Sequence, residues 1–209
     1  MAQFGKQRFP EGYQNSVGMK AASRLHENSV ELVEILAKNE LLRLDSKIFE
    51  LGSGPARNLY YIYKTLQENN YDTSNLELSC SDLWKDASLR SMNEDIKKII
   101  NFIEGDSEDV INNNIISNLD IFLVSDHFMH LQYDKADNII KKILSDWKPN
   151  YILLRELKKE GETPDHPRLF HDYNQFLTNY DMIEETSSKQ DNAYFIWLLK
   201  RKKETNVND

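Results

Sequence analysis

Residues 48–56 read IFELGSGPA, a short apolar run that leads into a turn with two glycines. The run is rich in residues that favour β structure, which predicts a strand over residues 47–51. Gly52 and Gly54 let the backbone turn sharply and let a ligand approach where a Cβ atom would obstruct it. The residues that follow carry an apolar stripe at helical spacing, formed by Leu59, Ile62, Tyr63 and Leu66. The stretch therefore predicts a strand, a glycine turn and a helix.

The glycine turn fits neither of two common nucleotide motifs. A dinucleotide fingerprint needs a third glycine at position 57, where this chain has Arg57, whose bulk would keep the helix from packing closely on the strand. A phosphate-binding loop of the Walker type needs Gly-Lys-Ser/Thr, and no such tripeptide follows. The residues therefore disfavour both NAD and the triphosphate of a nucleotide.

Strands and helices are expected to alternate along most of the chain. Asp134 is the expected N-cap of the helix before the fifth strand. Such an alternation closes by right-handed crossovers into a doubly wound α/β fold, with a mainly parallel sheet and helices on both faces. Ligands bind such sheets at the carboxyl ends of the strands. Further strands are predicted at residues 76–81, 102–106, 119–125 and 151–157, and helices at residues 17–38, 86–102 and 136–147.

The last quarter of the chain has a different pattern. Pro167 suits the first position of a helix that would run to Asn179. Residues 182–186 and 192–200 follow as two strands close enough in sequence to pair antiparallel. We expect a sheet of seven strands with an antiparallel last strand. The predicted organisation is an N-terminal extension and helical cap (residues 1–45), one core domain (46–203) and a polar tail (204–209).

Composition limits the function classes. The chain has 209 residues, a formal net charge of −8 and a single cysteine, Cys80, so no intrachain disulfide can form. No apolar run approaches the roughly 20 residues that cross a bilayer, and the N-terminus lacks the apolar core of a signal peptide. We expect a cytoplasmic protein that does not enter membranes. The acidic charge argues against a nucleic-acid partner, and the basic run 200–203 is typical of a solvated tail.

The glycine turn resembles motif I of the class I S-adenosylmethionine-dependent methyltransferases, in which an apolar strand leads to an acid, one residue, and then Gly-x-Gly with a small residue two positions on. Glu50, Gly52, Gly54 and Ala56 match this pattern. The last position is often glycine in that family, so Ala56 is a departure. The resemblance implies the Rossmann-like methyltransferase fold and S-adenosylmethionine as cofactor.

Three later landmarks of the family follow in the same order. Asp82 ends the second strand, where the family places an acid that accepts hydrogen bonds from the ribose hydroxyls. Asp106 and Ser107 resemble the step that contacts adenine. Residues 147–150 resemble the family's Leu-Lys-Pro-Gly turn, with Asn150 where glycine is usual and where Asn tolerates a positive φ. The cofactor-binding residues that the resemblance implies are Glu50, Gly52, Ser53, Gly54, Asp82, Leu83, Asp106, Ser107 and Ser125.

Residues 119–131 resemble motif IV of small-molecule methyltransferases, in which a strand end faces the transferred methyl group. An acceptor that carries a proton needs a base there, and we expect His127 first, because imidazole titrates near neutrality, and then Asp126 and His130. A histidine at a helix start can instead serve as a cap or pack. The predicted contacts to the small-molecule acceptor are Tyr13, Arg24, Glu156 and His171.

Several alternatives stay open. The fold without catalysis would give an S-adenosylmethionine-binding partner subunit, and protein or RNA methylation is a further possibility. A related fold also serves aminopropyl transfer, but the acid pair which that chemistry uses is not evident in this sequence. The chain has Ser-Asp-His-Phe where methyltransferases of nucleic-acid amino groups carry Asn/Asp-Pro-Pro-Tyr/Phe, which argues against that chemistry. We expect no metal, because no recognised ligand spacing occurs, although some catechol-type members of the family use a divalent cation.

Overall fold

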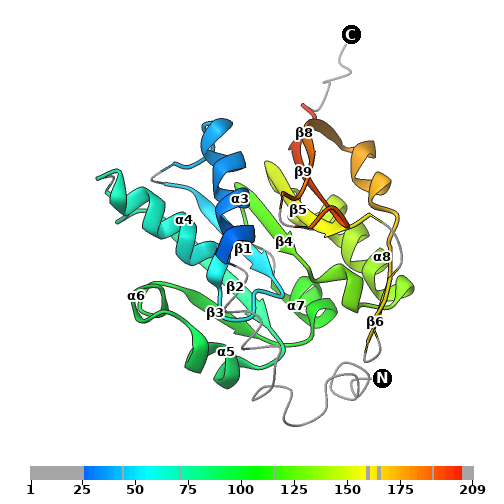
Figure 1. The fold of residues 1–209 in the computed structure, drawn as a ribbon, viewed down its shortest axis with the longest axis horizontal. Helices are drawn as coiled ribbons and strands as arrows, with labels where there is room; N and C mark the ends of the chain where they lie inside the picture. The colour runs from blue at the N-terminus through cyan, green and yellow to red at the C-terminus, as the bar shows by residue number, and fades with distance from the viewer. Residues whose placement is uncertain are drawn as a thin grey trace.

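The computed structural model describes residues 26–43, 45–70, 72–114, 116–158, 161–163, 166–189 and 191–203. Seven strands form one sheet in the order β3-β2-β1-β4-β5-β9-β8 (Figure 1). They are β1 (Lys47–Leu51), β2 (Glu77–Asp82), β3 (Asn101–Glu104), β4 (Ile121–Ser125), β5 (Tyr151–Leu157), β8 (Tyr180–Ser187) and β9 (Tyr194–Arg201).

The core of the sheet is parallel. β1 lies between β2 and β4, with Glu50 in register with Cys80 of β2 and Leu123 of β4. β9 is antiparallel to both of its neighbours, β5 and β8. The predicted doubly wound sheet of seven strands with an antiparallel last strand is confirmed. The strand bounds predicted at residues 47–51 and 151–157 agree with β1 and β5.

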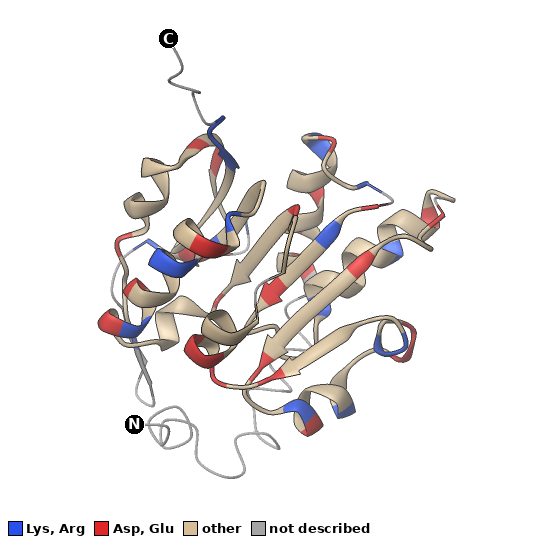
Figure 2. Ribbon diagram, turned by 180° about the vertical axis from the view of Figure 1, so that it is seen from behind, with Lys and Arg blue, Asp and Glu red and all other residues tan. Residues whose placement is uncertain are grey.

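Helices cover both faces of the sheet (Figure 1). Phe49 and Leu51 of β1 face the side of α7 and α8, whereas Ile48 packs on the side of α3 and α4. Because both faces of the central strands are covered, a strand such as β4 is apolar from Ile121 to Val124. Charged residues lie mainly on the helices and at the strand ends (Figure 2). The helices are α3 (His26–Lys38), α4 (Arg57–Glu68), α5 (Lys85–Ser91), α6 (Glu94–Lys97), α7 (Ser107–Asn113) and α8 (Tyr133–Lys142).

The single helix predicted over residues 86–102 is wrong. The backbone of Met92 is extended (ψ 144°), which ends α5. Asn93 then caps α6, because its side chain accepts a hydrogen bond from the N–H of Asp95. An Asn side chain that bonds the neighbouring backbone favours a helix start over a helix interior. The apolar periodicity of this segment therefore belongs to two short helices.

Two predicted helix starts also differ from the structure. Gln132, and not Asp134, is the N-cap of α8, and Asp134 lies in the first turn, where its charge suits the helix dipole. Pro167 lies in β7 (His166–Arg168), which pairs with β6 (Gly161–Thr163), so it starts no helix. A two-stranded sheet consists of edge strands, which tolerate proline. The helical turn comes later, as the 3₁₀ helix η5 (Tyr173–Thr178).

Candidate functional site

The carboxyl ends of β1, β2, β4 and β5 meet at one edge of the sheet. Glu50 lies near the end of β1, Asp82 ends β2, Asp126 follows β4, and Glu156 lies near the end of β5. The helices that follow β1 and β4 cover opposite faces of the sheet, so a crevice is expected outside these strand ends. Most residues that the sequence predicts for the site lie there.

In the glycine turn, every second residue from position 52 to position 56 has a backbone in the left-handed region. The φ angles are 67° at Gly52, 53° at Gly54 and 51° at Ala56. The N–H of Ser53 donates to the carbonyl of Ser81 on β2, 2.9 Å away, which fixes the turn to the sheet. Ala56 is the N-cap of α4 and is fully buried. A left-handed alanine costs roughly 1 kcal/mol, which explains why glycine suits this position better.

Asp82 lies directly against the turn. Its Oδ2 accepts the N–H of Gly54 at 2.9 Å, and its Oδ1 accepts the N–H of Trp84 at 3.3 Å. Removal from water raises the pKa of Asp82, and these backbone bonds offset part of the rise. A Cβ atom built on Gly54 would meet no described atom within 4 Å. The turn thus has open space at Gly54, and the carboxylate bonded to its N–H accepts one of these two bonds on each oxygen, which leaves lone pairs for further donors.

Glu50 is 2% exposed. Its Oε1 accepts a hydrogen bond from Nδ2 of Asn58 at 2.6 Å. Its Oε2 is buried, and no described residue donates a hydrogen bond to it. Burial raises the pKa of Glu50 to about 8, against the smaller lowering effects of Asn58 and Arg57. One oxygen of Glu50 is therefore held by Asn58, and the other is buried without a hydrogen-bond donor among the described residues.

Folding stability is expected to fall between pH 6.5 and pH 8, because the pKa of Glu50 is raised from 4.5 to about 8 on folding. The unfolded chain has lost this proton by pH 6.5, whereas the folded protein begins to lose it only near pH 8, so rising pH favours unfolding by roughly 1 to 2 kcal/mol. Urea unfolding at pH 6.5 and at pH 8 measures the change in the free energy of unfolding between the two pH values. Glu50→Gln should remove the part of this change that Glu50 causes. The control Glu27→Gln, at an exposed residue, should show the same change as the unaltered protein. If E50Q also shows the same change, the raised pKa of Glu50 is contradicted.

His127 lies between the glycine turn and the start of α7. Its Nε2 is 2.6 Å from Oγ of Ser107, and a Cβ atom on Gly52 would lie 2.0 Å from its Nδ1. Removal from water lowers the pKa of His127 to about 4, so the imidazole is neutral at pH 7. The ring forms a wall of the crevice and is held by a hydrogen bond to Ser107.

Asp126 pairs with a buried arginine. Its Oδ1 accepts a hydrogen bond from Nη1 of Arg155, whose guanidinium lies over the ring of Tyr194, 4.3 Å from the centroid. Arg155 is 2% exposed, whereas the Asp126 side chain is 22% exposed. Burial raises the pKa of Asp126 to about 6, against the lowering effects of Arg155 and Arg168. Asp126 is thus ionised above pH 6 and reaches the surface of the crevice.

Glu156 has no exposed surface. Its carboxylate accepts the N–H groups of His127, Phe128 and Met129, at 2.7, 2.8 and 3.2 Å. These bonds hold the start of the 3₁₀ helix η3 (Phe128–His130). Burial and the neighbouring Asp126 raise the pKa of Glu156 to about 8. In this geometry Glu156 positions the loop after β4.

The other predicted residues are spread around the same edge. His171 is 3% exposed, and its Nε2 lies 2.7 Å from the carbonyl of Phe128, so it packs behind η3. Asp106 caps α7 and pairs with Lys135. Leu83 follows β2, Ser125 ends β4, and His130 ends η3. Tyr13 and Arg24 lie outside the described residues.

No group of three or more metal-ligating side chains occurs among the residues that the structure describes. Within the same part of the chain, no helix has both the length and the apolar character that a membrane span requires.

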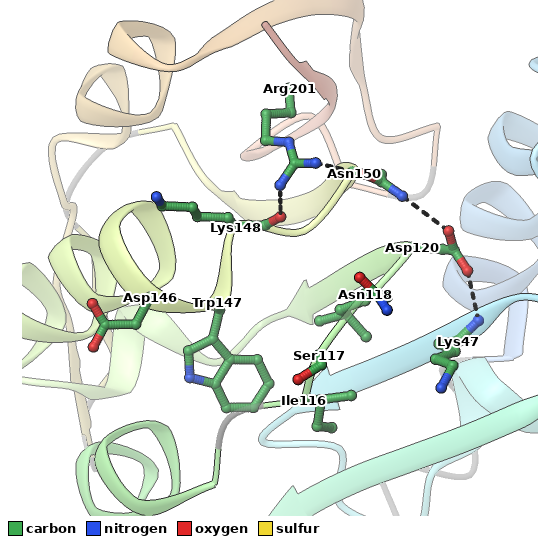
Figure 3. A pocket seen from close by; sticks show the side chains of 11 residues that line it. Lys47, Ile116, Ser117, Asn118, Asp120, Asp146, Trp147, Lys148, Asn150 and Arg201 are labelled. Atoms are coloured by element: carbon green, nitrogen blue, oxygen red, sulfur yellow. Dashed lines mark hydrogen bonds between the residues drawn. The ribbon is translucent and has the colours of Figure 1, made fainter. Parts of the chain in front are cut away.

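A cavity of about 350 Å³ lies at the opposite edge of the sheet (Figure 3). Its polar groups bind one another: Asp120 accepts from the N–H of Lys47 at 2.9 Å and from Nδ2 of Asn150 at 3.0 Å, and Asn150 Oδ1 accepts from Arg201 at 3.0 Å. This network joins the ends of four strands. The residue with positive φ in the turn before β5 is Lys148 (φ 42°) and not Asn150, so the tolerance of Asn for that conformation is not used here.

Sequence reasoning missed two residues of the site, Asn58 and Arg155. The sequence does contain a signal for Arg155, because this charged residue directly follows the apolar run 151–154 inside a predicted strand. Such a residue must be paired when the strand is buried. Asn58 carries none, because its contact with Glu50 depends on how α4 packs on β1.

The strand order, the antiparallel β9 and the glycine turn after β1 together define the fold of the class I S-adenosylmethionine-dependent methyltransferases. The family resemblance of the sequence is confirmed at the level of the fold. No family model matches the sequence, and no curated protein matches it either.

Solved structures similar to this chain include two methyltransferases and a third protein, TehB. Magnesium protoporphyrin IX methyltransferase from Synechocystis PCC 6803, solved with bound S-adenosylmethionine, is 11% identical with a TM-score of 0.63; the match covers 96% of this chain and 93% of that one. An S-adenosylmethionine-dependent methyltransferase from Aquifex aeolicus is 14% identical, with a TM-score of 0.56 over 88% and 97% of the two chains. TehB from Haemophilus influenzae is 19% identical, with a TM-score of 0.56 over 84% and 62%.

Proposed function

We propose that this protein transfers a methyl group from S-adenosylmethionine to a small-molecule acceptor. One observation carries the proposal: on a methyltransferase fold, the glycine turn has open space at the Cβ position of Gly54, and the N–H of Gly54 is bonded to the carboxylate of Asp82. The net charge of −8 supports a small acceptor over a nucleic acid, since an acidic protein repels phosphates.

The residues at the site fit this cofactor. Asp82 has lone pairs left on both oxygens, which suits two ribose hydroxyls. Glu50 has a buried oxygen that lacks a donor, which suits the ammonium of the methionine moiety. A Cβ atom at Gly54 would project into the open space in front of the turn, and the N–H of the same residue is bonded to Asp82. Asp106 and Ser107 would hold the adenine end.

When bound, the cofactor supplies a methyl group that its sulfonium has already activated, so the protein must mainly bind, orient and exclude water. The glycine turn and Asp82 orient the nucleoside. The His127 ring closes the crevice on the side of Gly52.

An acceptor that carries a proton needs a base, and we assign this role to Asp126. Its pKa of about 6 leaves it ionised at pH 7.5, and Arg155 engages only Oδ1, so Oδ2 can take the proton. His127 is less suited, because its pKa is about 4 and Ser107 engages its Nε2. Glu156 supports Asp126 indirectly by fixing the loop that follows it.

Asp82→Ala is expected to weaken binding of S-adenosylhomocysteine by about 2 kcal/mol, roughly 30-fold, because two charge-assisted hydrogen bonds disappear. Isothermal titration calorimetry measures this, with the exposed Asp86→Ala as a control that should bind like the unaltered protein. Equal affinity of D82A and the unaltered protein would remove Asp82 from the site.

Methyl transfer itself is tested with labelled S-adenosylmethionine and a cell extract separated into small molecules and macromolecules. Label in the small-molecule fraction supports the proposal. Label in protein or RNA would indicate the corresponding alternative, and binding without any transfer would indicate a partner subunit. Failure of S-adenosylhomocysteine to bind would overturn the proposed function.

A further inference from the structure

A chain of hydrogen bonds runs from α3 to the acid of the glycine turn. Oγ of Ser29 donates to Oδ1 of Asn58 at 2.7 Å, and Nδ2 of Asn58 donates to Oε1 of Glu50 at 2.6 Å. Ser29 and Glu50 are each 2% exposed. The three residues come from α3, α4 and β1, so the chain crosses the layer between the helices and the sheet.

The chemistry of the three groups fixes the direction of this chain. In its ionised form, which a cation would favour, Glu50 only accepts hydrogen bonds, so the amide of Asn58 must turn its nitrogen toward Oε1, as it does in the structure. Its oxygen then faces Ser29, whose hydroxyl must be the donor. Loss of the Ser29 hydroxyl would leave the orientation of the amide less constrained.

The helix that carries Ser29 is itself fixed to the sheet. The carboxylate of Glu31, which is 5% exposed, accepts Oγ of Ser188 at 2.7 Å and the N–H of Lys189 at 2.6 Å. Both partners lie in the connection between β8 and β9. Ser29 is therefore held at a constant place relative to Asn58.

Because Asn58 engages Oε1, the carboxylate of Glu50 has one orientation, and its buried Oε2 faces a position where no described group donates. A buried carboxylate oxygen without a donor is costly, and an ammonium group would satisfy it. We propose that Asn58, oriented by Ser29, is a positioning residue that presents Oε2 of Glu50 to the ammonium of the cofactor's methionine moiety. This inference rests on the proposed function.

The test compares two nucleosides that share adenosine and a sulfur atom. S-adenosylhomocysteine carries the ammonium, and 5′-methylthioadenosine does not. Asn58→Ala should weaken S-adenosylhomocysteine about tenfold at pH 7.5 and change methylthioadenosine by no more than about twofold, because one charge-assisted contact is lost. Asn69→Ala, at the exposed end of the same helix, should change neither.

A pH series separates positioning from a general loss of packing. The charged and titratable groups facing Glu50 are Arg57 of α4 and Cys80 and Asp82 of β2. Affinity of the unaltered protein for S-adenosylhomocysteine should rise between pH 6.5 and 8.5 as Glu50 loses its proton. In N58A the rise should shift to higher pH, since the lost donor favoured the ionised form.

Ser29→Ala is a second and milder variant, expected to weaken S-adenosylhomocysteine about threefold with methylthioadenosine unchanged. If N58A weakens both nucleosides equally, or leaves the pH profile unmoved, the positioning role is overturned while the proposed function stands. If the unaltered protein binds neither nucleoside, the proposed function fails instead.

Discussion

Gly52→Ala is expected to destabilise the protein by about 3 kcal/mol. Gly52 has a φ of 67°, which costs an alanine roughly 1 kcal/mol. The new methyl group would also lie 2.0 Å from Nδ1 of His127. Moving that ring breaks its bond to Ser107 and disturbs packing, which adds about 2 kcal/mol. Chemical unfolding measures the loss.

Two further variants separate the parts of this effect. Gly54 has nearly the same backbone strain (φ 53°) but open space around its Cβ position, so Gly54→Ala should cost only about 1 kcal/mol of stability. It should nevertheless abolish S-adenosylhomocysteine binding. In a double-mutant cycle, His127→Ala should recover more than 1 kcal/mol of the G52A loss. If the stability losses of G52A and H127A simply add in the double variant, the His127 ring does not clash with the new methyl group at position 52.

Asp126→Asn is expected to destabilise the protein by about 3 kcal/mol. Arg155 is 2% exposed, and Asp126 is the acid that pairs with its guanidinium. Removing the charge of one partner leaves a buried cation uncompensated, which costs far more than the pair itself contributes. Urea unfolding at pH 7.5 measures the change, and Asp134→Asn, an exposed acid in the first turn of α8, is the matched control.

The double variant Asp126→Asn with Arg155→Met should recover most of that stability, since an apolar side chain of similar volume replaces the buried ion. With the fold restored, this variant should bind S-adenosylhomocysteine within threefold of the unaltered protein and transfer methyl groups at least 100-fold more slowly. Full activity in the double variant would exclude Asp126 as the base.

The order of elements could be predicted from the sequence because each strand and helix has its own local signal. Val124 lies in a strand whose apolar residues are buried on both faces, and Leu59 and Ile62 lie on the buried stripe of α4. Segments with competing local signals were predicted less well. At Asn93 a capping side chain starts a new helix although the apolar periodicity continues. Pro167 suits a helix start by residue type, but it lies in an edge strand, which also tolerates proline.

The site followed the same division. Sequence placed Gly52, Gly54 and Asp82 at neighbouring strand ends, because the carboxyl ends of parallel strands meet at one edge. It ranked His127 above Asp126 as a base from the ordinary pKa of imidazole. We propose Asp126 instead, because burial lowers the pKa of His127, whereas Arg155 holds one oxygen of Asp126 and leaves the other.

The sequence alone determined the sheet, its glycine turn and the acids at the strand ends, since periodicity and turn chemistry act between residues close in the chain. Only the tertiary structure decided which of these acids is paired, which is a support and which has an oxygen left for a ligand. Glu50 meets Asn58 and Ser29, and Glu156 meets three backbone N–H groups. Such partners come from different elements, and burial and hydrogen bonding between elements set the ionisation of a carboxyl group.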